Sequence, residues 1–255
     1  MARKAQPKPT PRFAAQILDR LELAHPEARC ALDYRDAFQL SVATILSAQC
    51  TDERVNRVTP ALFARYPDAA ALAAAAPAEV EEIIRSTGFF RAKAKSLVGF
   101  AKGLVERHSG QVPRTIAELV PLPGIGRKTA NVVLGHAYDV NEGIAVDTHV
   151  RRVANRLGLV DSEDPGKIEV QLMSLVPRER WTRVTDLLIF HGRKVCDARR
   201  PACGVCPVFA LCRWESRFAW ANDRPPKARR QRTAPVRGAL RVRAARTVRK
   251  KRTRR

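Results

Sequence analysis

Four cysteines lie within seventeen residues near the end of the sequence, with the spacing C-x6-C-x2-C-x5-C. Side chains at this spacing can surround one metal centre, either a tetrahedral zinc ion or a 4Fe-4S cluster. A zinc ribbon usually has two separate C-x2-C pairs, whereas this segment has one such pair flanked by longer gaps. The spacing therefore favours an iron–sulfur cluster held by Cys196, Cys203, Cys206 and Cys212.

The rest of the chain indicates a reducing compartment and no membrane segment. At 255 residues it can form one large or two small domains with a sizeable buried core. No apolar run reaches the roughly 18 residues that a membrane span needs. No apolar stretch follows the basic residues 1–12 to make a secretory signal, and a transit peptide would be unusually short. In such a chain clustered thiols bind metal more often than they pair, and we expect the isolated Cys30 and Cys50 to be buried small side chains.

The formal net charge of +22 is concentrated at the two ends. Residues 221–255 carry a net +14 and residues 1–12 carry +4, which leaves +4 for the body, 13–220. Because 221–255 has few large apolar residues, we predict a disordered basic tail there and a basic extension over 1–12. A flexible polycation binds phosphate backbones without sequence preference. The tail therefore indicates a nucleic-acid partner, although a solubility tail or an acidic lipid partner fits the charge as well.

Apolar residues recur at helical spacing throughout the body, and no segment alternates as a strand does. The Ala-rich stretch 69–76 fits a short helix and a turn, because alanine is the best helix former. Gly88 fits the residue that follows a helix begun near Pro77. The sequence therefore predicts an all-α protein with short loops. The apolar stripes are Phe38, Val42, Ile45 and Leu46; Leu97, Val98, Ala101, Leu104 and Val105; Val150, Val153, Ala154 and Leu157; and Val184, Leu187, Leu188 and Phe190.

A hairpin between two helices is predicted at about 115–137, where residues 122–130 read Leu-Pro-Gly-Ile-Gly-Arg-Lys-Thr-Ala. Gly124 and Gly126 allow a tight turn and a close approach of the backbone to a phosphate. The free N–H groups at the start of the second helix then face the anion. Such a contact positions a protein on a duplex without reading its sequence. The segment resembles the helix-hairpin-helix DNA-binding motif, and a plain turn is the alternative.

Lys128 and Asp147 are the charged residues whose positions fit a reaction. Lys128 falls in the first turn of the second hairpin helix, where the positive helix end, with partial burial, favours the neutral amine nucleophile. A surface charge or a phosphate contact is the alternative for this lysine. Asp147 precedes an amphipathic helix and either caps it or faces Lys128, accepts its proton and stabilises positive charge on a sugar. Nineteen residues separate the pair, so spacing leaves both roles open.

The combination of motifs resembles the endonuclease III family, in collinear order over residues 13–218. The resemblance implies two α-helical domains, a six-helix barrel at 30–141 and an iron–sulfur cluster domain built from 13–29 and 142–220. It also implies that the cysteines hold a 4Fe-4S cluster and that DNA lies with a flipped base in the cleft between the domains. The segments that carry the resemblance are Ser47–Asp52, Leu122–Ala130, Val146–Val150, His191–Arg193 and the four cysteines.

The resemblance implies a bifunctional DNA glycosylase and abasic-site lyase that removes oxidised pyrimidines in base excision repair. Lys128 matches the nucleophile, which forms a Schiff base before β-elimination nicks the strand, and Asp147 matches the essential carboxylate. Gly124, Ile125 and Gly126 match the hairpin that holds the phosphate. The expected partner is double-stranded DNA with a damaged base or an abasic site, bound by a monomer without a membrane. The expected location is the cytoplasm, at the nucleoid, if the chain is bacterial, with nucleus and mitochondrion left open.

The same resemblance assigns further DNA contacts. Gln49 matches the residue that fills the gap left by the flipped nucleotide. Arg193 belongs to the basic residues around the cysteines, which their charge alone predicts to face DNA as a basic patch. Phe89 and Phe90 stand where relatives often carry Leu-Tyr in an intercalating loop, and this departure leaves the wedge geometry and the opposite-base preference open. Aromatic rings can stack into an opened base step; a core contact is the alternative for this pair.

Three other interpretations remain at this point. A monofunctional glycosylase for mismatched adenine or alkylated bases has the same motif, but such relatives generally lack a lysine at the position of Lys128. A non-catalytic helix-hairpin-helix protein would not need both Lys128 and Asp147. A zinc-stabilised RNA-binding module would be colourless, unlike an iron–sulfur protein. The base pocket has no readable motif, so the sequence does not predict the lesion range.

Overall fold

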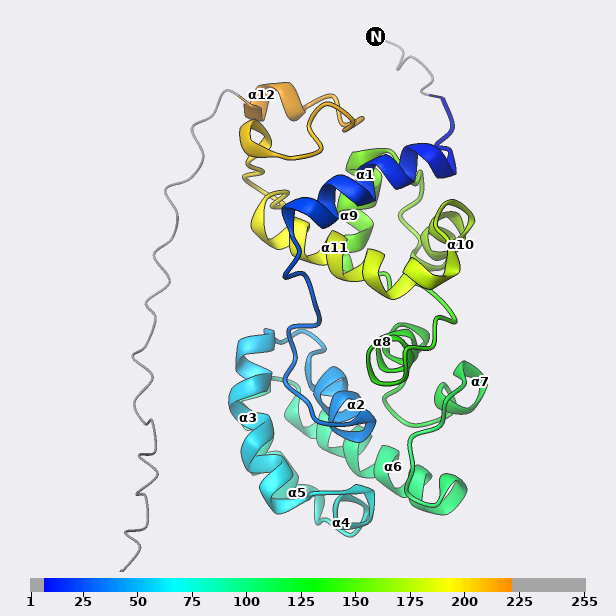
Figure 1. Ribbon diagram of the computed structural model, residues 1–255. Helices are drawn as coiled ribbons and strands as arrows, with labels where there is room; N and C mark the ends of the chain where they lie inside the picture. Colours follow the sequence, from blue (N-terminus) through cyan, green and yellow to red (C-terminus); the bar gives the residue numbers. More distant parts are fainter. Residues whose placement is uncertain (1–6, 222–255) are drawn as a thin grey trace, which may run out of the picture. The chain divides into compact units, whose positions relative to one another are not determined.

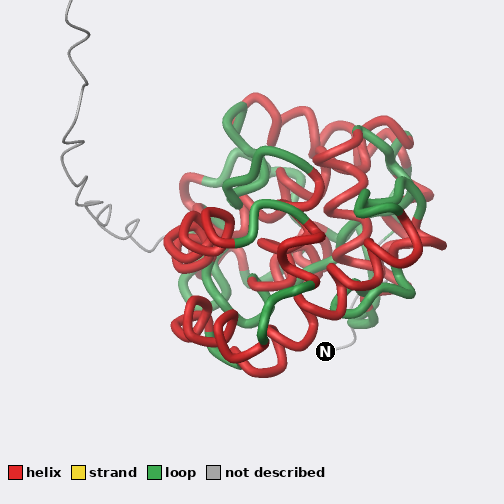
Figure 2. The backbone as a smooth tube through the Cα atoms, turned by 90° about the horizontal axis from the view of Figure 1, so that it is seen from below, coloured by secondary structure: helices red, strands yellow, loops and turns green. Residues whose placement is uncertain are grey.

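The computed structural model describes residues 7–221, and over that range the backbone forms helices and loops without a strand (Figures 1 and 2). The prediction of an all-α fold is confirmed. The predicted tail beyond Ala221 and the first six residues of the basic extension lie outside the described residues. The α-helices are α1 (Pro11–Ala24), α2 (Ala37–Leu46), α3 (Asp52–Arg65), α4 (Ala69–Ala73), α5 (Pro77–Ile84), α6 (Phe90–His108), α7 (Ile116–Leu119), α8 (Arg127–Tyr138), α9 (Thr148–Leu157), α10 (Pro165–Leu175), α11 (Trp181–Lys194) and α12 (Arg217–Ala221). Short 3₁₀ turns are η1 (Arg85–Thr87), η2 (Arg178–Arg180) and η3 (Cys203–Val205).

Side-chain caps determine where several helices begin. A hydroxyl or carboxylate before the helix accepts a hydrogen bond from a first-turn N–H that otherwise lacks a partner. Asp36, Asp68 and Asp164 cap α2, α4 and α10 in this way at 2.8 Å. Thr51 and Thr115 cap α3 and α7 at 3.3 Å. The short helix predicted in the Ala-rich stretch is α4, and it therefore begins at the side-chain cap that Asp68 supplies.

The buried apolar side chains form two cores within one compact unit. The first core joins α2 to α8 and is built around large side chains such as Leu46, Leu97 and Phe100. The second core joins α1 to α9, α10 and α11, and it includes Val208 from the cysteine loop. In Figure 1 the dark blue α1 accordingly lies beside α10 and α11, which follow much later in the sequence. The chain thus starts in the second core, builds the first and then returns.

Three details of the predicted helices differ in the structure. Val105, which was predicted on the apolar stripe, is 43% exposed, because the buried face of α6 ends at Leu104. Gly88 ends η1 rather than α5, with φ +72° and ψ 156°, since the 3₁₀ turn takes up the chain after α5. Cys30 and Cys50 are half-buried rather than buried, packed against the edge of the first core.

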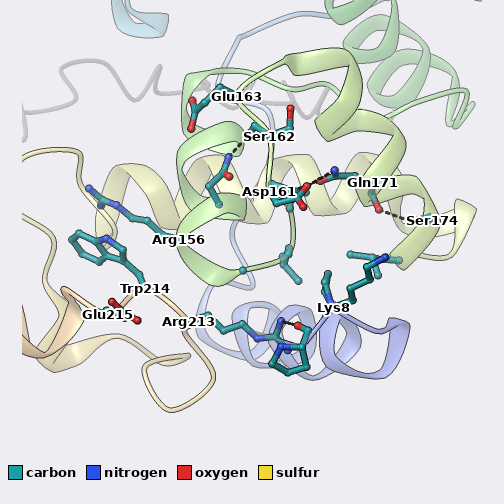
Figure 3. A pocket seen from close by; sticks show the side chains of 17 residues that line it. Lys8, Arg156, Asp161, Ser162, Glu163, Gln171, Ser174, Arg213, Trp214 and Glu215 are labelled. Atoms are coloured by element: carbon teal, nitrogen blue, oxygen red, sulfur yellow. Dashed lines mark hydrogen bonds between the residues drawn. The ribbon is translucent and has the colours of Figure 1, made fainter. Parts of the chain in front are cut away.

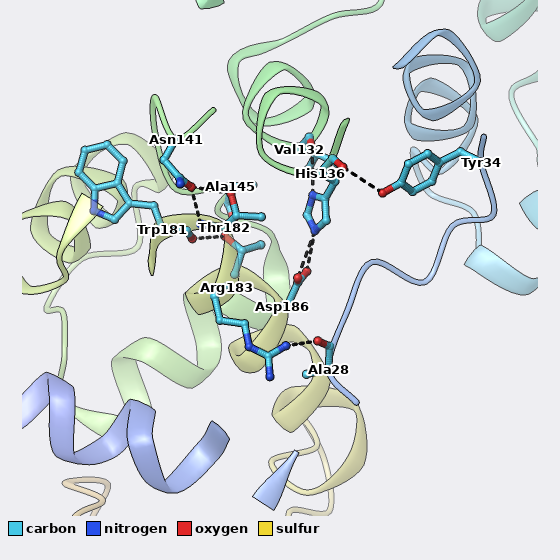
Figure 4. Close-up of polar contacts among 11 residues, drawn as sticks. Ala28, Tyr34, Val132, His136, Asn141, Ala145, Trp181, Thr182, Arg183 and Asp186 are labelled. Atoms are coloured by element: carbon cyan, nitrogen blue, oxygen red, sulfur yellow. Dashed lines mark hydrogen bonds and ion pairs between the residues drawn. The ribbon is translucent and has the colours of Figure 1, made fainter. Parts of the chain in front are cut away.

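A polar contact joins the two cores between α8 and α11 (Figure 4). The nearly buried ring of His136 lies between two acceptors, with Nδ1 3.0 Å from the Val132 oxygen and Nε2 3.0 Å from Asp186 Oδ1. Because only the imidazolium donates from both nitrogens, this arrangement favours the charged ring. Burial lowers the pKa of His136, but the hydrogen bond and charge of Asp186 outweigh it and raise the pKa above 6.5. Tyr34 also donates to the His136 carbonyl at 3.2 Å.

The His136–Asp186 contact predicts that stability declines as the pH rises. A pKa raised on folding stabilises the folded state fully below 6.5, and this contribution is lost as the pH rises through the folded-state pKa. We expect His136→Gln to lower the urea midpoint more at about pH 6 than at about pH 9. The control is the same change at the half-exposed His108. An equal loss at both pH values would contradict a charged His136.

Candidate functional site

The predicted hairpin lies between α7 and α8, and a buried side chain attaches it to the first core. The side chain of Ile125 is 4% exposed and belongs to the first core, so the residue offers its backbone, not its side chain, to the surface. Gly124 has φ +79°, and a Cβ there would lie 3.0 Å from the side chain of Ser96, so both conformation and space favour glycine. Gly126 precedes α8, and no side chain caps this helix end. The first N–H groups of α8 are therefore open to an external anion.

Lys128 and Asp147 each lie at the start of a helix. Lys128 is the second residue of α8 and is exposed, so the partial burial expected for it is not present in the free protein. Asp147 is half-buried and caps α9, accepting a 2.7 Å hydrogen bond from the Val150 N–H at Oδ1. The interpretation of Asp147 as a helix cap is confirmed. Among residues 7–221 no ion pair joins it to Lys128, so the structure leaves their pairing as a prediction.

A buried carboxylate that the sequence did not indicate anchors the start of α8. Glu169 on α10 is 6% exposed and accepts hydrogen bonds from Arg127 Nε at 2.7 Å and Asn131 Nδ2 at 2.9 Å. Both donors flank Lys128 on α8. A Cβ on Gly143 would lie 2.1 Å from Glu169 Oε1, so the adjoining loop packs directly against this group. The helix turn that carries Lys128 is thus bonded to the second core.

The residues predicted to enter the duplex lie on two tight turns. Gln49 is exposed with φ 52°, and Phe89 is 65% exposed with φ 47°. Left-handed backbone is rare for residues other than glycine and is found preferentially at functional sites. Phe90 instead begins α6 and packs against the first core, with Arg85 over its ring at 5.7 Å. The aromatic pair is therefore divided, with Phe89 at the surface and Phe90 in the core contact.

The four cysteines line one small cavity, together with His191 and Arg156. No three His, Cys, Asp or Glu side chains that could hold a single metal ion are found in the described part of the chain, and the thiols instead surround this space. Burial and the neighbouring thiols raise the pKa of Cys206 to about 12, and burial also raises the pKa values of Cys203 and Cys212. Thiols in this setting become thiolates only beside strong positive charge, which a metal cluster supplies. The donor set therefore fits the predicted cluster.

Two arginines hold the cysteine loop, and neither was predicted. Arg152 donates to the carbonyl oxygens of Gly192 and Cys196 at 3.0 and 3.2 Å. Arg156 donates to the carbonyl oxygen of Asp197 at 2.7 Å and lies 4.2 Å from the Trp214 ring centroid. Each arginine belongs to α9, whose apolar stripe was visible in the sequence, but the carbonyls they reach are distant along the chain. The signal for them was only that both fall on the polar face of a helix preceding the cysteines.

The basic residues expected to face DNA around the cysteines are partly engaged within the protein. Arg193 pairs with Asp52 of α3 at 2.7 Å, and 41% of its side chain is exposed. Arg213 lies over the Phe13 ring at 4.0 Å and donates to the Pro7 oxygen at 2.6 Å. The predicted basic patch is therefore smaller in the free protein than the sequence indicates.

A second hollow, shown in Figure 3, lies between residues 7–9, the α9–α10 connection and residues 213–215. It shares Arg156 and Trp214 with the cysteine cavity. It contains none of the residues predicted for catalysis, and Arg213 is the member of the predicted basic patch that lines it.

Comparison with known proteins agrees with this geometry. Residues 42–178 match the HhH-GPD superfamily of base excision DNA repair proteins, and residues 196–212 match the iron–sulfur binding domain of endonuclease III. Endonuclease III of Synechocystis sp. is 55% identical over 78% of this chain and 91% of its own length, and that of Bacillus subtilis is 46% identical over 77% and 90%. A solved structure of a trapped endonuclease III–DNA covalent intermediate is 42% identical, with a TM-score of 0.77 over 80% of this chain and 96% of that chain.

The fold and the site together define a base excision repair protein of the helix-hairpin-helix class. The chain belongs to the endonuclease III family. The predictions of a DNA-binding enzyme that acts as DNA glycosylase and abasic-site lyase, and of a 4Fe-4S cluster, are thereby confirmed. Within residues 7–221 no helix is long and apolar enough to cross a membrane.

The cap on α9 predicts a stability effect that separates hydrogen bonding from charge at Asp147. Asp147→Ala removes the acceptor for the Val150 N–H, and we expect it to lower the free energy of unfolding by about 1 kcal/mol. Asp147→Asn keeps an acceptor oxygen and should leave the free energy of unfolding close to that of the wild type. Urea unfolding of the intact protein measures both. Equal losses in the two variants would show that the cap is not what Asp147 contributes to folding.

Proposed function

We propose that this chain removes oxidised pyrimidines from double-stranded DNA with Lys128 as nucleophile and then cleaves the strand at the resulting abasic site. The observation that carries the proposal is the exposed amine of Lys128 on the first turn of α8, directly beside an uncapped helix end that can receive a backbone phosphate. A phosphate bound there would bring the sugar of a neighbouring nucleotide toward the amine.

The reaction begins with extrusion of the nucleotide, because its C1′ atom cannot be reached within stacked duplex, at a cost of about a few kcal/mol. The Lys128 amine forms a bond to C1′ while the glycosidic bond breaks, and the base leaves with the bonding electrons and a proton. Opening of the sugar gives a Schiff base between C1′ and the lysine nitrogen. Loss of a C2′ proton then expels the 3′ phosphate and nicks the strand.

Asp147 has one oxygen in the cap and one for chemistry. Its Oδ1 accepts the Val150 N–H, and among the described residues no hydrogen bond occupies the second oxygen. We assign to that oxygen the proton of Lys128 and the stabilisation of positive charge on the sugar. Since Lys128 is exposed in the free protein, the exclusion of water that favours its neutral amine must come from the bound duplex.

The remaining predicted site residues are assigned to DNA. The backbone of Gly124, Ile125 and Gly126 holds the phosphate. Gln49 fills the gap left by the extruded nucleotide, and exposed Phe89 is the wedge, whereas Phe90 supports it from the core. Arg193, paired with Asp52 in the free protein, adds a phosphate contact. The substrate is a duplex with a damaged base or an abasic site, bound by a monomer, and in a bacterium the enzyme would act at the nucleoid.

The two cores support a division into two domains. Every buried member of the first core lies between Leu32 and Leu134, which fits a barrel domain at 30–141. The second core draws on residues 14–28 and 144–208, which fits a discontinuous cluster domain at 13–29 and 142–220. Cys196, Cys203, Cys206 and Cys212 are the proposed ligands, and the bound cluster supplies the iron–thiolate bonds that hold their loop together.

Borohydride trapping tests the nucleophile. We expect wild-type protein to form a covalent adduct with DNA that contains an abasic site, because borohydride reduces the Schiff base, and Lys128→Ala to form none. Lys102→Ala, which removes another exposed lysine, should trap as well as the wild type. A trapped adduct in a cluster-loaded Lys128→Ala protein would contradict the assignment. Base release without any adduct in the wild type would indicate a monofunctional glycosylase.

Cysteine substitutions test the ligand set. We expect Cys206→Ser to reduce bound iron and the visible absorption of the purified protein, because its thiol faces the shared cavity. Cys50→Ser, outside that cavity, should retain both. Bound zinc in a colourless wild-type protein, or full iron content in Cys206→Ser, would count against this assignment.

A further inference from the structure

A buried lysine that the proposed reaction does not use lies beneath the site. Lys93 on α6 is 5% exposed, and no ion pair to it is found in residues 7–221. Its Nζ donates instead to two carbonyl oxygens, those of Leu46 and Thr87, each at 2.8 Å. Burial lowers the pKa of Lys93, which shows that its surroundings oppose the charge. A buried ammonium is costly unless its hydrogen bonds are satisfied, so the residue needs these two acceptors.

The two carbonyls belong to the ends of different elements. Leu46 is the last residue of α2, and Thr87 is the last residue of η1. Carbonyls at such ends lack partners within the helix and carry partial negative charge, which a cation stabilises. One ammonium thus closes two ends that lie 41 residues apart in the sequence. The backbone N–H of Lys93 also donates to the Phe89 oxygen at 3.0 Å, so Lys93 makes two hydrogen bonds to the segment Thr87–Phe89.

Each closed end leads directly into one of the two left-handed turns. Gln49 follows Leu46 by three positions, and Phe89 follows Thr87 by two. Left-handed conformations of residues other than glycine persist only where the surrounding structure holds them. The ammonium of Lys93 donates a hydrogen bond to the residue that precedes each of these two turns.

We propose that Lys93 is a positioning residue that holds the Gln49 turn and the Phe89 turn at a fixed separation, so that gap-filling and wedge side chains enter the duplex as one unit. This inference rests on the proposed function, in which both side chains contact DNA. Lys93 itself does not touch the substrate. An apolar side chain would fill the same space without the burden of a buried charge, but it would leave both carbonyls unpaired and the turns independent.

Lys93→Met tests this coupling, because methionine replaces the ammonium with an apolar side chain of similar length. We first expect amide hydrogen exchange of the free protein to accelerate in 47–50 and 87–90 together. We then expect the single-turnover excision of a thymine glycol from duplex DNA to slow by about tenfold to a hundredfold, the scale for a small misplacement of reacting groups. Cleavage at a pre-formed abasic site should slow less, since no stacked base has to be extruded. Lys102→Met, on the exposed face of α6, is the matched control for lost charge.

A double-mutant cycle with Gln49→Ala shows whether the effect passes through the turn. If it does, Lys93→Met adds little to the loss already caused by Gln49→Ala, so the two losses are not additive. Additive losses, faster exchange in only one segment, or equal losses on both substrates would overturn the proposal. If Lys93→Met does not fold, Lys93→Gln replaces it, because glutamine keeps two N–H donors on a shorter side chain. We expect Lys93→Gln to give an intermediate exchange rate in both segments. A wild-type exchange rate in both segments would overturn the proposal. A wild type that neither excises the base nor traps an adduct would instead refute the proposed function, whereas the exchange result is obtained without DNA.

Discussion

One helix, α8, is bonded to the opposite core at both of its ends, and the geometry of the site depends on this. Near its start, Glu169 of α10 accepts hydrogen bonds from Arg127 and Asn131. Near its end, His136 contacts Asp186 of α11. A nearly buried carboxylate left without its partner is strongly destabilising, so each contact resists movement of α8 against the second core. The first turn of α8, which carries Lys128, therefore cannot shift toward α9 or away from it without breaking a buried polar contact.

This rigidity bears on the proposed role of Lys128 as the nucleophile. Lys128 is exposed to solvent in the free protein. In the proposed reaction the protein supplies the position of the amine, and DNA that covers the helix end supplies the exclusion of water. Chemistry in this proposed reaction is coupled to binding, because only an extruded nucleotide would place C1′ within reach of the amine. A fixed α8 ensures that the amine is already in place when the duplex arrives.

The parts of the fold that could be predicted from the sequence have local signals. Gly124 and Gly158 adopt the positive φ that a turn and a helix end require, and Asp147 lies where a cap belongs. The buried polar groups have no such signal, because they have partners far along the chain. Asn131 and Glu169 are 38 positions apart, Lys93 and Leu46 are 47 apart, and His136 and Asp186 are 50 apart. Helical periodicity assigns a residue to a face but cannot state which distant carbonyl or carboxylate meets it there.

Lys93 is a charged residue on the apolar face that helical periodicity predicts for α6. It lies four positions before Leu97 and eleven before Leu104, which are both fully buried on the inner face of α6. The ammonium of a lysine on such a stripe either extends to solvent or donates to acceptors within the core, and the sequence alone does not distinguish these outcomes. Phe89 and Phe90 show the opposite limit. They are neighbours of the same type, yet a left-handed residue between η1 and α6 sends one to the surface and one to the core.

The first-turn N–H groups of α8 and α9 are treated in opposite ways, and the difference fits the roles proposed for the two helix ends. α9 is closed by the carboxylate of Asp147, whereas α8 begins at Gly126 without a side-chain cap. An aspartate at Gly126 would occupy the first-turn N–H groups with a charge of the same sign as a phosphate and would repel the DNA backbone. At α9 the cap instead fixes the orientation of a carboxylate whose second oxygen has no partner among the described residues. Exchanging the two residue types would therefore block the proposed phosphate site and release the carboxylate from its fixed position.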